Sequence, residues 1–213
     1  MKAQTRRSSG LLWLTALAFT MLTSQAAAEA GSWLVRAGVH SVNPKSDNGE
    51  VAALAADLEV ESAEQFTFDI TYMFTDHLGL EVLAAIPFEH DIEIGGAELA
   101  STKHLPPTIS LVYRFNPQDK VVFYGGLGVN VTLFFEEDTR GALAGADLEL
   151  DTSVGPAAVV GADVQLNDRW FLNADLRYMD IDTDATVTAP GLRLKESVEI
   201  DPWAVGLRVG YRF

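Results

Sequence analysis

The sequence has no cysteine, few basic residues and no hydrophobic run long enough to span a membrane as a helix. The absence of cysteine excludes a disulfide scaffold, thiol chemistry and cysteine-ligated zinc or iron–sulfur sites. Only 15 lysines and arginines stand against 30 aspartates and glutamates, a net charge of −15. This balance argues against nucleic acid as a partner, because phosphate binding needs a basic face. The 213 residues suffice for one domain or at most two, and 48% hydrophobic residues argue against an acidic disordered chain.

Residues 1–28 have the order of a secretory signal peptide. Lys2, Arg6 and Arg7 precede the apolar run 10–22, and three alanines end at Ala28. A spanning helix needs about 20 residues, so the run is too short to cross a membrane. A buried core helix, the alternative, would show a second, polar face. We expect cleavage after Ala28, with Ala26 as a rival position, leaving a barrel domain at 29–213 with a net charge of −18.

The remaining chain alternates between apolar and small or polar residues, which is typical of strands whose two faces differ. In the last eleven residues one parity is wholly apolar, and it consists of Trp203, Val205, Leu207, Val209, Tyr211 and Phe213. The same pattern predicts eight strands, at 33–40, 66–74, 78–86, 109–115, 121–135, 156–166, 170–179 and 203–213.

The connections alternate in length. Those at 74–77, 116–119 and 167–169 are short and turn-like, whereas 44–64, 88–105, 136–152 and 180–197 are predicted as long loops rich in acidic residues, glycine and alanine. Short turns at one end and long loops at the other indicate an all-β, eight-stranded antiparallel up-and-down transmembrane β-barrel.

A soluble β-sandwich would also alternate, with its apolar face inside. Three observations favour the barrel. The apolar faces run uninterrupted over five or six positions, the opposite faces carry many glycines, and Trp33, Trp170 and Trp203 lie near strand ends on the apolar parity, as in an interfacial girdle.

Several segments resemble the outer membrane protein W (OmpW) family, which includes proteins tied to alkane uptake. They are TYM at 71–73, AAIPF at 84–88, HLPPT at 104–108, GVN at 128–130, FF at 134–135, YMDIDT at 178–183, DPW at 201–203 and GYRF at 210–213. The resemblance covers the whole chain after the signal peptide. It implies a Gram-negative outer-membrane barrel with both termini in the periplasm, and passive uptake of small hydrophobic molecules with sideways exit into the membrane.

The polar parity predicts an ion-paired plug inside the barrel, because buried charges are normally paired. Its members are Arg36, Asp69, Glu81, Arg114, Asp163, Asp175, Arg177 and Arg208. The alternative is a polar conduit for ions. Near the loop end the inward positions become apolar, which predicts a mouth for a hydrophobic ligand. This mouth comprises Leu54, Leu83, Phe88, Leu105, Phe134, Met179 and Ile200. The alternative is that these side chains only pack the loops.

No residue pattern indicates catalysis, a cofactor or a metal site. The four histidines lie far apart in the sequence, and the Asp-rich stretch 180–184 departs from a calcium loop at its sixth and twelfth positions. Tyr211 and Phe213 form an aromatic carboxyl-terminal signature that we expect the barrel-assembly machinery to read. The expected partners are outer-membrane lipid, lipopolysaccharide and small hydrophobic solutes. A non-transporting receptor, adhesin or membrane anchor acting through the loops is the alternative function.

Overall fold

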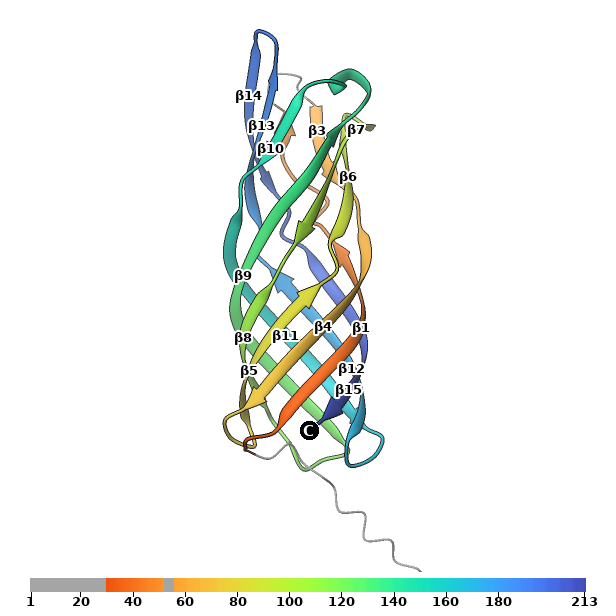
Figure 1. Ribbon diagram of the computed structural model, residues 1–213, viewed down its shortest axis with the longest axis vertical. Helices are drawn as coiled ribbons and strands as arrows, with labels where there is room; N and C mark the ends of the chain where they lie inside the picture. The colour runs from red at the N-terminus through yellow and green to blue at the C-terminus, as the bar shows by residue number, and fades with distance from the viewer. Residues whose placement is uncertain (1–29, 52–55) are drawn as a thin grey trace, which may run out of the picture.

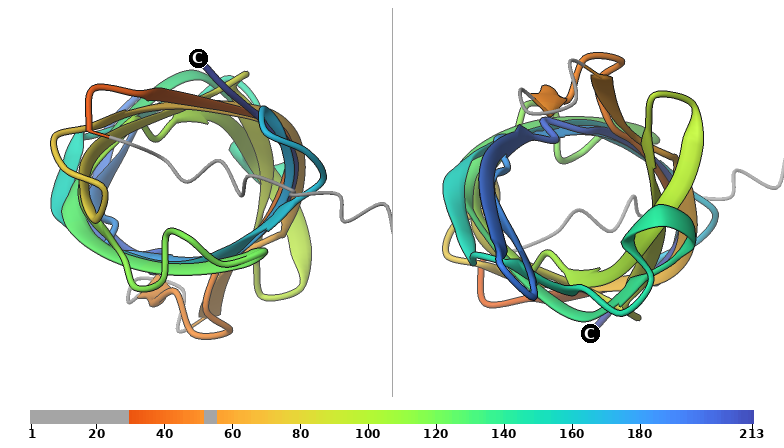
Figure 2. Two further views of the ribbon diagram at one scale, coloured as in Figure 1. Left: turned by 90° about the horizontal axis from the view of Figure 1, so that it is seen from below. Right: turned by 90° about the horizontal axis from the view of Figure 1, so that it is seen from above.

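The computed structural model describes residues 30–51 and 56–213, so the predicted signal peptide lies outside the described residues. Eight antiparallel strands close into a barrel (Figures 1 and 2), and they are β1 (Trp33–Asn43), β4 (Ala63–Met73), β5 (Leu78–Ala85), β8 (Thr108–Arg114), β9 (Val121–Thr139), β11 (Ser153–Gln165), β12 (Trp170–Met179) and β15 (Trp203–Arg212). The order is β11-β12-β15-β1-β4-β5-β8-β9, and pairing of β11 with β9 closes the ring. The predicted barrel and its eight strands are confirmed.

No helix in the described part of the chain is long and apolar enough to cross a membrane.

The alternation of each strand separates an apolar outer surface from a polar interior. Outward side chains such as Leu127 (74% exposed) and Leu207 (69% exposed) contact no protein core, whereas inward ones such as Asp69 and Asp163 are fully buried. Such a surface is stable only where lipid surrounds it, since apolar area in water costs about 25 cal/mol per Å². Outward aromatic pairs lie near both strand ends, including Trp170 against Tyr211 and Tyr178 against Trp203.

Short turns join the strands at the end of the barrel where the carboxyl terminus lies (Figure 1). In two of these turns an asparagine side chain forms hydrogen bonds with backbone groups of the turn, as is common for asparagine in turns. Asn167 Oδ1 accepts from the backbone N–H groups of Arg169 and Trp170, and Asn116 Nδ2 donates to the Val121 carbonyl. The backbone N–H of Phe213 donates to the Trp33 carbonyl at 2.9 Å, which ties the chain's last residue to β1.

At the opposite end, the prediction of four long loops is wrong, because most of these residues extend the wall as strands. The added strands are β2 (Glu50–Val51), β3 (Ala56–Val60), β6 (Phe88–Ile94), β7 (Ala97–Leu105), β10 (Asp147–Leu150), β13 (Asp182–Ala189) and β14 (Leu192–Glu199), with a short 3-10 turn, η1 (Gly141–Leu143). Strands β7-β6-β3-β2 continue the sheet from β9, and β10-β13-β14 form a separate three-stranded sheet. Because these strands are short and carry acidic residues at their outer positions, the sequence shows no clear apolar–polar alternation in them.

The two halves of the molecule have different interiors. Inside the barrel, charged and amide side chains fill the space, and glycines make room for them. A Cβ atom at Gly206 would collide with the side chains of Asp175 and His40. Inside the extension formed by the added strands, the buried residues form an apolar cluster that includes Phe88, Ile92 and Val198. The interior therefore changes from polar to apolar along the barrel axis.

Candidate functional site

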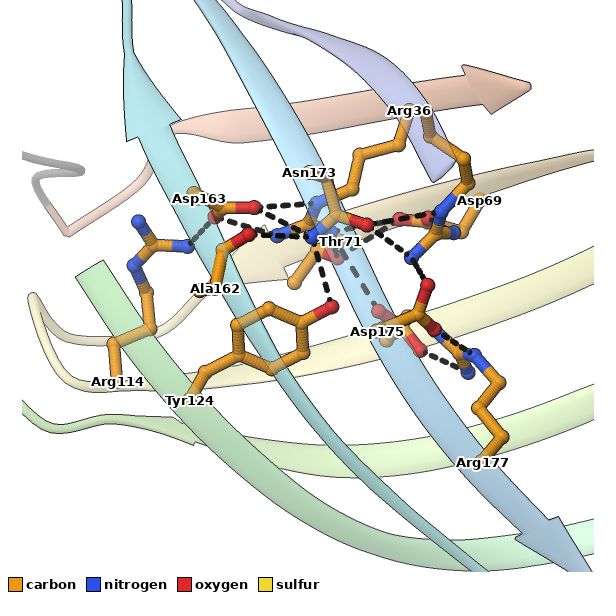
Figure 3. A network of polar contacts seen from close by, with 12 residues as sticks. Arg36, Asp69, Thr71, Arg114, Tyr124, Ala162, Asp163, Asn173, Asp175 and Arg177 are labelled. Atoms are coloured by element: carbon orange, nitrogen blue, oxygen red, sulfur yellow. Dashed lines mark hydrogen bonds and ion pairs between the residues drawn. The ribbon is translucent and has the colours of Figure 1, made fainter. Parts of the chain in front are cut away.

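The eight predicted plug residues lie together inside the barrel, and all are buried. Figure 3 labels Arg36, Asp69, Arg114, Asp163, Asp175 and Arg177 among them. We call the eight residues the plug. Arg36, on β1, lies at its centre. Its guanidinium donates to both carboxylate oxygens of Asp163, at 3.2 and 3.0 Å, and to Asp69 at 2.9 Å. The same cation lies 5.2 Å from the Tyr124 ring centroid. One arginine thus joins β1, β4, β9 and β11 across the barrel.

The other arginines of the plug complete the ion pairs. Arg114 contacts Asp163 at 2.7 Å, and Arg177 contacts both Glu81 at 2.7 Å and Asp175 at 2.5 Å. Arg208 pairs with Asp69 and with Asp175. Four cations and four anions give the plug a formal charge of zero, and each of these buried charges has at least one opposite partner. Such pairing is what makes buried charge tolerable.

Neutral polar side chains fill the gaps between the ion pairs. Asn173 donates to Asp163 at 2.8 Å and accepts two hydrogen bonds from Arg208. His40 contacts Thr67 at 2.6 Å and Asp175 at 3.3 Å. This crosslinked network fills the lumen of a barrel that eight strands already make narrow.

Above the plug, the extension encloses a cavity that we call the apolar chamber. It is lined by Val51, Leu58, Val60, His90, Ile92, Ile94, Ala100, Thr102, His104, Phe134, Leu143, Leu148, Leu150, Thr183, Ala185, Val187, Leu194, Glu196, Val198 and Ile200. The free space is about 80 Å³, measured as the volume open to the centres of water-sized molecules. One water needs about 10–15 Å³ on this measure, so the chamber has room for a small organic molecule.

A narrow layer of side chains separates the chamber from the plug. Phe88 and Met179, both buried, line a smaller cavity of about 10 Å³ whose lower wall includes His40 and Arg177. A void of this size holds at most one water. The chamber therefore ends at this layer and does not continue into a water-filled pore.

The predicted mouth residues divide between the two cavities. Phe134 and Ile200 line the chamber, and Leu83, Phe88 and Met179 line the smaller cavity below it. Leu105 lines neither. Its neighbour His104 points into the chamber, and successive side chains of a strand point to opposite faces, so Leu105 faces outward. Leu54 lies outside the described residues.

Sequence reasoning missed a pair of histidines in the chamber wall. His90 on β6 and His104 on β7 lie 2.8 Å apart between their Nε2 atoms, and Phe88 stacks on both rings. Burial lowers the pKa of His104 to about 3, and the neighbouring His90 adds to this effect. Burial also lowers the pKa of His90. His104 lies in the HLPPT segment at 104–108, which the sequence had singled out. The sequence could not show that the His104 side chain points inward, because strands β6 and β7 were not predicted.

A cluster of three carboxylates lies at the rim, and the sequence indicated only part of it, the Asp-rich stretch 180–184. Asp180, Asp182 and Asp201 each bring one oxygen within 4.8 Å of the others. Burial and the two neighbouring carboxylates raise the pKa of Asp182. Lys45 pairs with Asp201 at 3.2 Å, which compensates part of this charge.

The comparisons with known proteins agree with this geometry. The family model described as "OmpW family" matches residues 29–213. Outer membrane protein W of Vibrio cholerae is 43% identical over 195 residues, covering 87% of this chain and 90% of that protein. Outer membrane protein AlkL of Ectopseudomonas oleovorans is 29% identical over 163 residues, covering 74% and 70%.

A solved structure extends the match to three dimensions. The crystal structure of the outer membrane protein OprG from Pseudomonas aeruginosa superimposes with a TM-score of 0.80 at 36% identity, covering 87% of this chain and 97% of that one. The lipid-suited outer surface and the curated relatives place the protein in the Gram-negative outer membrane. The chain belongs to the OmpW family of outer-membrane β-barrel proteins.

Proposed function

We propose that this protein passively takes up small hydrophobic molecules, which enter the apolar chamber from outside the cell. The observation that carries the proposal is an apolar cavity at the outer end of the barrel with a closed, ion-paired plug beneath it. Concave apolar cavities with few polar groups are the usual binding sites of hydrophobic ligands. A conduit for ions would instead need a continuous aqueous path, which the plug does not offer.

Because the plug closes the straight route to the periplasm, a solute in the chamber must leave through the wall. The wall has a seam between the outer half of β9 and β10. The ladder between β9 and β11 ends at the pair Thr132 and Ser153, and in the described chain no ladder joins β9 to β10. Phe134 on one side of the seam and Leu148 on the other both line the chamber. This seam is the exit we propose.

A disulfide across the seam tests the exit. Thr139 Oγ1 donates to the Ala146 carbonyl at 2.8 Å, so these two residues are neighbours across the seam. The chain has no cysteine of its own, so the bond across the seam is the one intramolecular disulfide that the double variant Thr139→Cys/Ala146→Cys can form, and a non-reducing gel separates it from crosslinked copies. Uptake should fall under oxidising conditions and return on reduction. Equal uptake in the oxidised and reduced forms would contradict exit through the seam.

Loss of the whole protein tests the uptake itself. Gram-negative cells that produce the protein should take up octane faster than cells without it. No difference between the two would favour the alternative role, that of a receptor, adhesin or membrane anchor acting through the outer extension. The homologous barrels are named as outer membrane proteins.

Tyr211 and Phe213 remain the residues that we propose for recognition by the barrel-assembly machinery. Their rings lie 4.7 Å apart in an edge-on contact, and the Phe213 side chain is 72% exposed on the outer surface. An aromatic pair at the end of the last strand, with Phe213 exposed and Tyr211 half-buried, offers a partner a contact before the barrel closes.

A further inference from the structure

A row of three aromatic rings crosses the inner face of the wall at the lower end of the apolar chamber. Phe88, His104 and Phe134 are directly opposite one another on the neighbouring strands β6, β7 and β9. The rings of Phe88 and His104 stack with 5.4 Å between their centroids, and those of His104 and Phe134 stack with 6.0 Å between theirs. Three strands therefore contribute one continuous aromatic layer at this level.

Hydrogen bonds and packing hold this layer in place. His90 Nδ1 lies 2.5 Å from the carbonyl oxygen of Glu61, and His90 Nε2 lies 2.8 Å from His104 Nε2. Phe88 stacks on both histidines and is only 2% exposed. In a close-packed interior, a ring between partners that are themselves fixed has little freedom to move aside. The lower end of the chamber is therefore rigid.

Phe88 fills the space between the two cavities of the protein. The histidines on which it stacks, His90 and His104, line the chamber above, whereas Phe88 and Met179 line the smaller cavity below. Phe88 and Met179 also belong to the same buried apolar cluster. The lower wall of the smaller cavity includes Arg177, so the apolar surroundings end there. Phe88 is thus the ring that keeps the apolar interior divided.

We infer that the Phe88 ring sets the length of the apolar chain that the chamber holds. A linear solute lying along the barrel axis gains affinity from each methylene group that it buries, and this gain ends where its tip meets the aromatic layer. Carbons beyond that length stay outside the chamber. Without the ring the chamber and the smaller cavity would join, and a longer chain would fit until it reached Arg177. This inference rests on the proposed function and names the residue that determines its length specificity.

A series of linear alkanes from pentane to dodecane measures this length. Binding is followed for the mature full chain in lipid nanodiscs, from the amide chemical shifts of β13 and β14. The free alkane is measured in the headspace, so that each affinity refers to water, and empty nanodiscs correct for partitioning into lipid. The affinity should rise about fourfold per methylene group, which corresponds to about 0.8 kcal/mol, up to a limiting length, and then stay constant.

The variant Phe88→Val should move this limit to longer alkanes. Valine has fewer side-chain carbons than phenylalanine, and the surroundings collapse only partly into the space that the ring leaves, so we expect a shift of roughly two carbons. Phe88→Leu preserves more of the packing and should give a smaller shift in the same direction. The control Phe66→Val makes the same change on the outward face of β4, where Phe66 is 44% exposed, and should leave the limit unchanged. The folded barrel is verified in each variant by the different gel mobility of unheated and boiled samples.

The possible results separate this inference from the proposed function. An affinity that rises over the whole series in the unmodified protein would overturn the length limit and leave the proposed function in place. The same limit in the unmodified protein and in folded Phe88→Val or Phe88→Leu would exclude Phe88 as its cause, as would an equal shift in Phe66→Val. Failure of every alkane to bind the unmodified protein would overturn the proposed function and this inference together.

Discussion

Replacing Arg36 with methionine tests whether the plug is a structural element of the barrel. The substitution keeps an unbranched apolar stem and deletes a cation that contacts Asp69, Glu81 and Asp163 at 2.9, 3.5 and 3.0 Å. The plug then carries a formal charge of −1 in a buried site. Removing one partner of a buried ion pair costs about 3–5 kcal/mol, because the remaining charge is left uncompensated.

The free energy of unfolding is measured by urea titration in lipid vesicles. We expect a loss of about 3–5 kcal/mol for Arg36→Met. The control Arg193→Met alters an exposed arginine on β14 and should change the stability by at most about 0.5 kcal/mol. A loss below about 1 kcal/mol for Arg36→Met would match an exposed pair and would refute the plug as an energetically coupled network.

The same variant gives a second readout in planar bilayers. The unmodified protein should show low ionic conductance, because four arginines and four carboxylates fill the lumen and are buried. Arg36→Met should raise the conductance by opening space at the centre of the network. A large, steady conductance in the unmodified protein would contradict the plug.

Three further predictions address the surface, the histidines and assembly. Leu207→Arg places a charge near the middle of the lipid-facing side of β15 and should lower the free energy of unfolding in vesicles by about 2–4 kcal/mol. Leu192→Arg, in the outer hairpin, should be nearly neutral, and equal losses for the two variants would contradict the assignment of β15 to the membrane and of the hairpin to water. The pKa of His104 is 6.5 in the unfolded chain and about 3 in the fold, so the unfolded state binds more protons between these two pH values. The β6–β7 hairpin should therefore lose protection against hydrogen exchange as the pH falls from about 6.5 towards about 3. His104→Phe should weaken that dependence, and an unchanged pH profile would exclude the histidine as its source. Deleting Phe213 should impair insertion in cells more than folding into detergent, and equal effects would indicate that it only completes the apolar face.

The sequence predicted the barrel strands well because lipid on one side and a packed lumen on the other impose a strict alternation. In 203–213 every second residue is apolar, and the strand β15 (Trp203–Arg212) coincides with that segment. The same parity assigned Arg36 and Asp163 to the inner face, where the structure has them, although the pairing itself requires the barrel to close.

The outer extension could not be predicted in the same way. Its strands face water outside, so acidic residues occupy the outer positions, and strands of seven to nine residues such as β6 and β7 carry too little apolar–polar pattern to be recognised. His104 and Leu105 illustrate the result. Because no strand was predicted at these residues, the sequence did not indicate which of the two side chains points inward. Leu105 was placed at the mouth, whereas His104 lines the chamber. The small-residue turn at Gly95 and Gly96, with φ of 60° and 76°, was the available sign of a hairpin.

The uptake of octane by cells carrying a chamber-blocking variant tests the central proposal most directly. Ala185 lines the chamber on β13, and Ala185→Trp fills it, whereas the matched control Thr186→Trp places the same ring on the outward face of the same strand. Equal amounts of folded barrel are verified by the different gel mobility of unheated and boiled samples. We predict that Ala185→Trp lowers uptake to the level of cells lacking the protein and that Thr186→Trp leaves it unchanged. Full uptake through the Ala185→Trp protein would contradict passage through the chamber.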